Sequence, residues 1–76
     1  MTEEDLITLL KNEFNVHNKF HKDDRLSALG LDSLEIILLI VKLESLLKKS
    51  ITDKEMENLS TVDDVLQLAN EKLLEE

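Results

Sequence analysis

The sequence DSLEIILLIVKLESLLKK, residues 32–49, decides the fold class. Asp32 is a favourable helix N-cap, and Glu35 follows it at the spacing of a capping box. Aliphatic residues then recur at helical spacing. This predicts a helix that begins at Asp32 or Ser33 and ends near Lys49, with Lys48 and Lys49 in the last turn, where cations suit the helix dipole. Its expected core stripe consists of Ile36, Leu39, Ile40, Leu43 and Leu47.

Three further helices are expected around this one. Thr2 and Asp5 form a capping pattern at the start of a helix from about Glu3 to Phe14. The segment Asp53 to Asn58 is long enough for one or two helical turns, and Thr61 precedes a final helix. The expected apolar stripe of that final helix consists of Val62, Val65, Leu66, Leu68, Ala69, Leu73 and Leu74.

The segment between the first two helices, residues 15–31, is expected to be a long ordered loop held by isolated apolar anchors. Proline is absent and glycine occurs once in 76 residues, which favours helix throughout. We therefore predict one domain, residues 1–76, with an all-α fold. It is a small four-helix bundle of three longer helices and one short one, with a long loop between the first two helices.

Composition excludes several classes of function. A net charge of −8 and only two aromatic residues argue against a nucleic-acid partner. The absence of cysteine excludes disulfides, thiolate zinc sites and catalytic thiols. His17 and His21 have a metal-binding spacing but lie in the expected loop, so we expect no metal site. No apolar run is long enough to span a membrane. We expect a soluble, cytoplasmic monomer, and no cluster of acid, base and nucleophile that would indicate an enzyme.

The residues around Gly30 suggest a site for modification. Gly30 allows the loop to turn, Asp32 caps the helix, and the Ser33 hydroxyl is left at the helix N-terminus. Free backbone N–H groups and the positive end of the helix dipole favour a phosphate esterified to such a hydroxyl. Taken alone, however, Asp32 and Ser33 are more simply explained as helix-capping residues.

The wider string Leu26-x-x-Leu29-Gly30-Leu31-Asp32-Ser33-Leu34 resembles the signature of the acyl carrier protein family, in its free-standing, type II form. Residues 51–56 (ITDKEM) and 60–65 (STVDDV) resemble the family's third helix and the start of its fourth. The resemblance implies that a phosphopantetheinyl transferase attaches 4′-phosphopantetheine to Ser33, with Asp32 helping to position the cofactor. It also implies a carrier, not an enzyme, whose arm holds acyl or aminoacyl groups as thioesters for loading and synthase enzymes.

The outer face of the second helix is the expected partner-binding surface. It consists of Leu34, Glu35, Ile37, Leu38, Val41, Lys42 and Ser45. Four of the seven are aliphatic, so either the helix is largely enclosed or this face recognises partners. Fatty-acid members of the family usually have a strongly acidic second helix, whereas this chain has Leu38 at a place where an exposed acid is usual. We therefore favour a dedicated polyketide or nonribosomal peptide pathway over housekeeping fatty-acid synthesis. A cofactor-free helical adaptor is the remaining alternative.

Overall fold

The computed structural model describes residues 1–17 and 19–74; Asn18, Glu75 and Glu76 lie outside the described residues. The described part contains the α-helices α1 (Glu3–Phe14), α2 (Ser33–Leu47), α3 (Asp53–Glu57) and α4 (Val62–Leu74), and a 3₁₀ turn, η1 (Leu26–Leu29). It includes no β-strand. The predicted all-α fold with three longer helices and one short one is confirmed, and η1 lies within the expected loop.

Each of the four α-helices begins with a reciprocal capping box. The N-cap residue and its partner are Thr2 and Asp5 for α1, Asp32 and Glu35 for α2, Thr52 and Glu55 for α3, and Thr61 and Asp64 for α4. The N-cap backbone N–H donates to the acidic partner and lowers the pKa of Asp5, Glu55 and Asp64. The helix starts are therefore set by local hydrogen bonds that need no tertiary contact.

The C-terminal ends of α2 and α3 differ from the prediction. α2 ends at Leu47, because Lys48 adopts a left-handed conformation (φ 55°) and its N–H donates to the Glu44 carbonyl. Lys48 and Lys49 thus lie beyond the last turn and not within it. The Glu44 carboxylate also accepts the Ile51 N–H at 2.9 Å, which helps turn the chain towards α3. α3 ends at Glu57, one residue before the predicted end.

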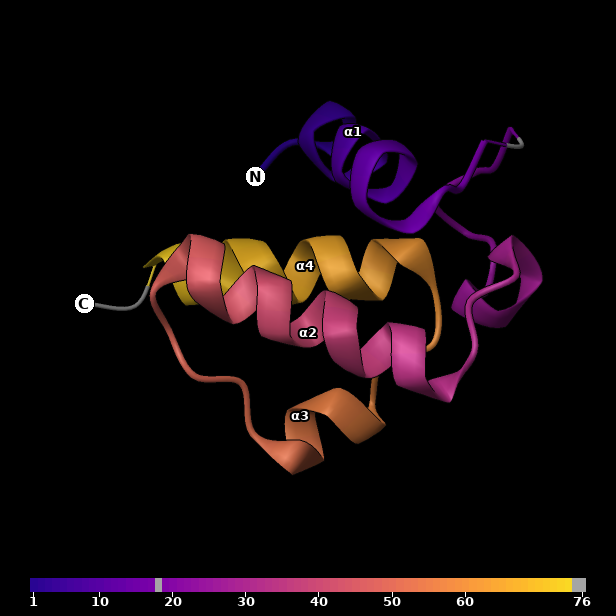
Figure 1. Cartoon of the computed structure of the whole chain (residues 1–76). Coiled ribbons are helices and arrows are strands. Elements are labelled where there is room, and N and C mark those ends of the chain that lie inside the picture. Colours follow the sequence, from indigo (N-terminus) through magenta and orange to yellow (C-terminus); the bar gives the residue numbers. More distant parts are fainter. Residues whose placement is uncertain (18, 75–76) are drawn as a thin grey trace.

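The core lies where α1 and α3 meet the pair α2 and α4. Figure 1 shows α2 and α4 side by side, with α1 above them and α3 below in this view. Four members of the predicted α2 stripe are buried, and Ile36 is half-buried against them. The α4 stripe was predicted too long, because Leu73 and Leu74 are exposed at the end of the helix, whereas Val62, Val65, Leu68 and Ala69 are buried.

The loop between α1 and α2 is hydrogen-bonded to the residues at the start of α4. Val16, Leu26 and Leu31 are buried within it. The Leu26 N–H donates to the Ser60 carbonyl at 2.9 Å, and Arg25 forms an isolated antiparallel bridge with Thr61. These backbone contacts hold the segment that leads into α2. Within the described ranges, no helix has the length and apolar character needed to cross a membrane.

Lys72 is a buried cation that the sequence pattern did not indicate. Its side chain lies in α4 with the residue only 7% exposed, and its Nζ is 2.9 Å from Glu55 Oε1 in α3. The same oxygen accepts hydrogen bonds from the N–H and the hydroxyl of Thr52, at 3.0 and 3.1 Å. Because α3 contributes no fully buried residue, this carboxylate is an important polar link between α3 and the bundle.

We expect the Lys72–Glu55 contact to make stability sensitive to acid. The Thr52 N–H and then Lys72 lower the pKa of Glu55 below its ordinary value of 4.5. The resulting stabilisation is therefore complete above pH 4.5 and is lost as the pH falls through the lowered pKa. Lys72→Met keeps the apolar stem but removes the cation. It should lower the melting temperature at about pH 7 by several degrees, and by less at about pH 3.

The measurement is thermal melting followed by circular dichroism at both pH values. Lys54→Met, which removes an exposed cation from α3, serves as the control for lost charge. A Lys72→Met protein that melts with the wild type at about pH 7, or that loses as much at low pH as at neutral pH, would contradict this account.

Candidate functional site

Ser33 is the first residue of α2, and its backbone is fixed by the cap that precedes it. Asp32 Oδ1 accepts the Glu35 N–H at 2.8 Å, and Glu35 Oε1 accepts the Asp32 N–H at 3.4 Å. The Ser33 side chain is exposed, and its hydroxyl forms no hydrogen bond with the residues that the structure describes. The structure thus combines a constrained main chain with a hydroxyl that is available to a reagent from solution.

The chain enters this site through a left-handed turn at Gly30. Gly30 has φ 87° and caps η1, where its N–H donates to the Ser27 carbonyl. A Cβ atom at this position would meet nothing within 4 Å, so glycine is favoured by the backbone conformation and not by close packing. Leu31, which is buried, then anchors the chain between the turn and the cap. Together these residues fix the position of Ser33 at the start of α2.

The electrostatics at Ser33 favour an attached anion. The Asp32 carboxylate accepts a hydrogen bond from the Glu35 N–H, whereas the N–H groups of Ser33 and Leu34 have no partner among residues 1–17 and 19–74. These groups lie at the positive end of a 15-residue helix. A phosphate ester on the Ser33 hydroxyl would therefore lie beside unpaired donors and a favourable helix dipole.

The structure brings the aliphatic members of the predicted partner face together on the outside of α2. Leu34, Ile37, Leu38 and Val41 are between 46% and 64% exposed, so the alternative of an enclosed helix is excluded. Two polar members of the predicted face are engaged elsewhere. Glu35 is half-buried in the capping box, and Lys42 lies 3.5 Å from Glu13 of α1. Leu46, 54% exposed near the end of α2, was missing from the predicted set.

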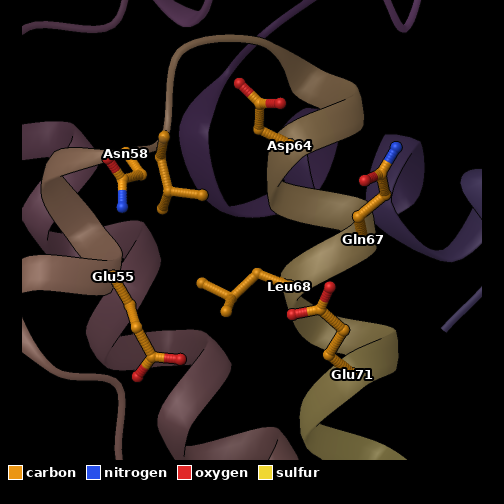
Figure 2. Close-up of a pocket in the computed structure, with 7 residues that line it drawn as sticks. Glu55, Asn58, Asp64, Gln67, Leu68 and Glu71 are labelled. Atoms are coloured by element: carbon orange, nitrogen blue, oxygen red, sulfur yellow. The ribbon is translucent and has the colours of Figure 1, made fainter.

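A pocket with a volume of about 210 Å³ lies between α3 and α4. Figure 2 shows the Glu55 and Glu71 carboxylates on either side of Leu68, with Asp64 and two amide side chains nearer the other end. Two of these carboxylates already have partners, because Glu55 binds Lys72 and Asp64 caps α4. Among the described residues, no group of three or more histidine, cysteine or acidic side chains is arranged to hold a metal ion.

Comparisons with known proteins agree with this geometry. A family described as the phosphopantetheine attachment site matches residues 4–69. Among solved structures, the chain is similar to the crystal structure of an acyl carrier protein from Thermotoga maritima. The two are 20% identical and superpose with a TM-score of 0.82, over 92% of this chain and 84% of that one. No curated protein sequence matches.

Proposed function

We propose, from the premise that this chain belongs to the acyl carrier protein family, that Ser33 is the residue to which its 4′-phosphopantetheine is attached. The family domain is the attachment site for this covalent group, and its members are carrier proteins, not enzymes. The choice of Ser33 rests on one observation. Its hydroxyl is exposed at the first position of α2, directly after the Asp32 cap.

The residues around Ser33 fit the chemistry of this group. The hydroxyl is accessible, the neighbouring N–H groups can bind phosphate oxygens, and the side chain leaves the bundle into solvent. Once attached, the group supplies the thiol that holds the cargo as a thioester. The chain's own residues present this arm at a fixed place: Gly30 turns the backbone, Leu31 anchors it and Asp32 starts the helix.

A phosphopantetheinyl transferase is the partner that the modification requires. A bond forms between Ser33 Oγ and the pantetheine phosphorus of coenzyme A, the pyrophosphate linkage breaks, and adenosine 3′,5′-bisphosphate leaves. We assign removal of the hydroxyl proton to the transferase, because the Asp32 carboxylate is engaged with the Glu35 N–H. Asp32 then acts by holding the helix start and helping the transferase to position its cofactor.

We assign the carrier to a dedicated polyketide or nonribosomal peptide pathway, in which it acts as a free-standing, cytoplasmic monomer with acyl or aminoacyl cargo. The carboxylates on α2 support this choice over fatty-acid synthesis. Glu35 belongs to the capping box, and Glu44 accepts the Ile51 N–H. Neither carboxylate is therefore fully available to a basic partner surface. Attraction between such a surface and acidic side chains is the usual means of electrostatic steering.

The experiment is stepwise loading followed by intact-mass measurement. Incubation with coenzyme A and a broad-specificity transferase should convert the chain to the modified form, and peptide mapping should place the added mass on Ser33. The modified protein is then offered malonyl-coenzyme A with a fatty-acid malonyltransferase, or amino acids with adenylating enzymes. Malonyl loading as fast as that of a fatty-acid carrier would support the housekeeping alternative, and no added mass in the first step would contradict the carrier function.

A further inference from the structure

Two lysine side chains and two apolar ones line a pocket between α1 and the loop that follows it. The pocket has a volume of about 250 Å³, and its lining residues are Ile7 and Lys11 of α1 and Lys19 and Phe20 of the loop. Ile7 and Lys11 are four residues apart, so they lie on the same side of α1. Phe20 is half-buried and packs against the core, which holds the loop side of the pocket in place. None of the four residues belongs to α2 or to residues 30–33, so this pocket is separate from the candidate attachment site.

The two lysines of this pocket have no anionic partner. Among the residues that the structure describes, neither Lys11 nor Lys19 forms an ion pair or a side-chain hydrogen bond. The chain has 17 acidic and nine lysine or arginine side chains, so a lysine in it should meet a carboxylate more often than another cation. Here two ammonium groups share one pocket, and no carboxylate is among the four lining residues. An anion bound in the pocket would offset the repulsion between the two cations.

The segment around the pocket is positively charged although the chain is acidic. Residues 11–25 carry four of the nine basic side chains and three of the 17 acidic ones, a net charge of +1, whereas the remaining residues carry −9. The three acids of this segment already have partners. Glu13 is paired at 3.5 Å with the lysine of α2, and the Asp24 carboxylate accepts the His21 N–H at 2.8 Å. Asp23 Oδ2 lies 3.3 Å from Nδ1 of the same histidine. None of these acids therefore neutralises the two lysines of the pocket.

We propose that this pocket binds a small carboxylate with an apolar body of about six carbons, held by the two lysines and by contact with Ile7 and Phe20. Exposed pairs of lysine and carboxylate contribute little by themselves, so the head group alone would bind very weakly. The apolar body adds affinity because it leaves water for contact with the two apolar side chains. The size follows from the volume: an engineered cavity of about 150 Å³ in another protein holds benzene, and this pocket is larger. The inference goes beyond the proposed function, because it needs neither Ser33 nor the attached arm.

The test is an NMR titration of the whole, unmodified chain with hexanoate, in which the backbone amide shifts report binding. Two further compounds separate the parts of the ligand: acetate has the carboxylate without the body, and hexylamine has the body with the opposite charge. Lys11→Met and Lys19→Met remove a cation but keep the apolar stem, and Ile7→Ala removes part of the apolar wall. Lys22→Met is the matched control, because it removes an exposed cation of the same loop that does not line the pocket.

We expect hexanoate to bind with a Kd of about 1 mM and to shift the amides of the four lining residues most. Acetate and hexylamine should each bind about tenfold more weakly than hexanoate. Removal of either pocket lysine should weaken hexanoate binding about threefold, and removal of both about tenfold. Ile7→Ala should also weaken it about threefold, and Lys22→Met should bind like wild type.

Four outcomes would overturn the proposal. They are the absence of saturable shifts with hexanoate, shifts that lie away from the pocket, hexylamine binding as tight as that of hexanoate, and an equal loss of binding in Lys22→Met and Lys11→Met. A wild-type dimer that the double variant of Lys11→Met and Lys19→Met dissociates would also overturn it, because a second copy would then occupy the pocket. If Ile7→Ala does not fold, the lysine variants still decide, because both side chains are exposed and should not affect melting.

Discussion

A Ser33→Ala protein should gain no phosphopantetheine under conditions that convert the wild type completely. The reaction requires a hydroxyl at the place where Gly30, Leu31 and Asp32 present the chain to solvent. Four other serines are available, but none follows this turn and cap: Ser27, Ser45, Ser50 and Ser60. Ser27 lies in the middle of η1, and Ser45 lies in the last turn of α2. The expected effect is therefore complete loss and not a lower rate.

The control for this result is Ser50→Ala, which removes another exposed hydroxyl, beyond the C-terminal end of α2. It should be modified at the wild-type rate. Ser33→Ala should also melt within a few degrees of wild type, because Asp32 provides the cap and the Ser33 hydroxyl forms no hydrogen bond with the described residues. Intact-mass spectrometry of the three proteins gives the answer. Added mass on Ser33→Ala would show that another residue carries the group.

The helix starts and the place of Ser33 at the start of α2 could be predicted because their determinants are local. Each capping box consists of residues three apart, and the turn at Gly30 and the hydroxyl of Ser33 lie within one short string. The buried and exposed faces of α2 follow from helical spacing alone, as Leu39 and Leu38 illustrate. These features are visible in the sequence because no distant residue is needed to produce them.

The features that the sequence did not predict depend on distant partners. Lys72 looks like an ordinary cation in the last turn of α4, and only the position of α3 brings Glu55 to it. The bridge between Arg25 and Thr61 is a backbone contact, so no side-chain pattern marks it. Similarly, Lys42 could be placed on the outer half of α2, but its contact with Glu13 depends on how α1 crosses the bundle.

Replacing Leu39 with alanine should cost far more stability than the same replacement at Leu38. Leu39 is 0% exposed among side chains of the core, whereas its neighbour Leu38 is 50% exposed. A buried leucine truncated to alanine costs about 2–5 kcal/mol. A domain of this size has a total stability of about 4–11 kcal/mol, so Leu39→Ala should remove a large fraction of it. Leu38→Ala should change the free energy of unfolding by about 0.5 kcal/mol or less.

The two variants, measured by denaturant unfolding and by the rate of Ser33 modification, separate the role of each face of α2. Leu38 and Leu39 are neighbours in the same turn of α2, so the change in helix propensity is the same for both replacements. Leu39→Ala should lower stability but leave the modification rate of the folded fraction near that of wild type. Leu38→Ala should leave stability close to that of wild type but lower the modification rate. Equal losses of stability would mean that Leu38 belongs to the core, and the outer face of α2 would then be needed for folding and not available to partners.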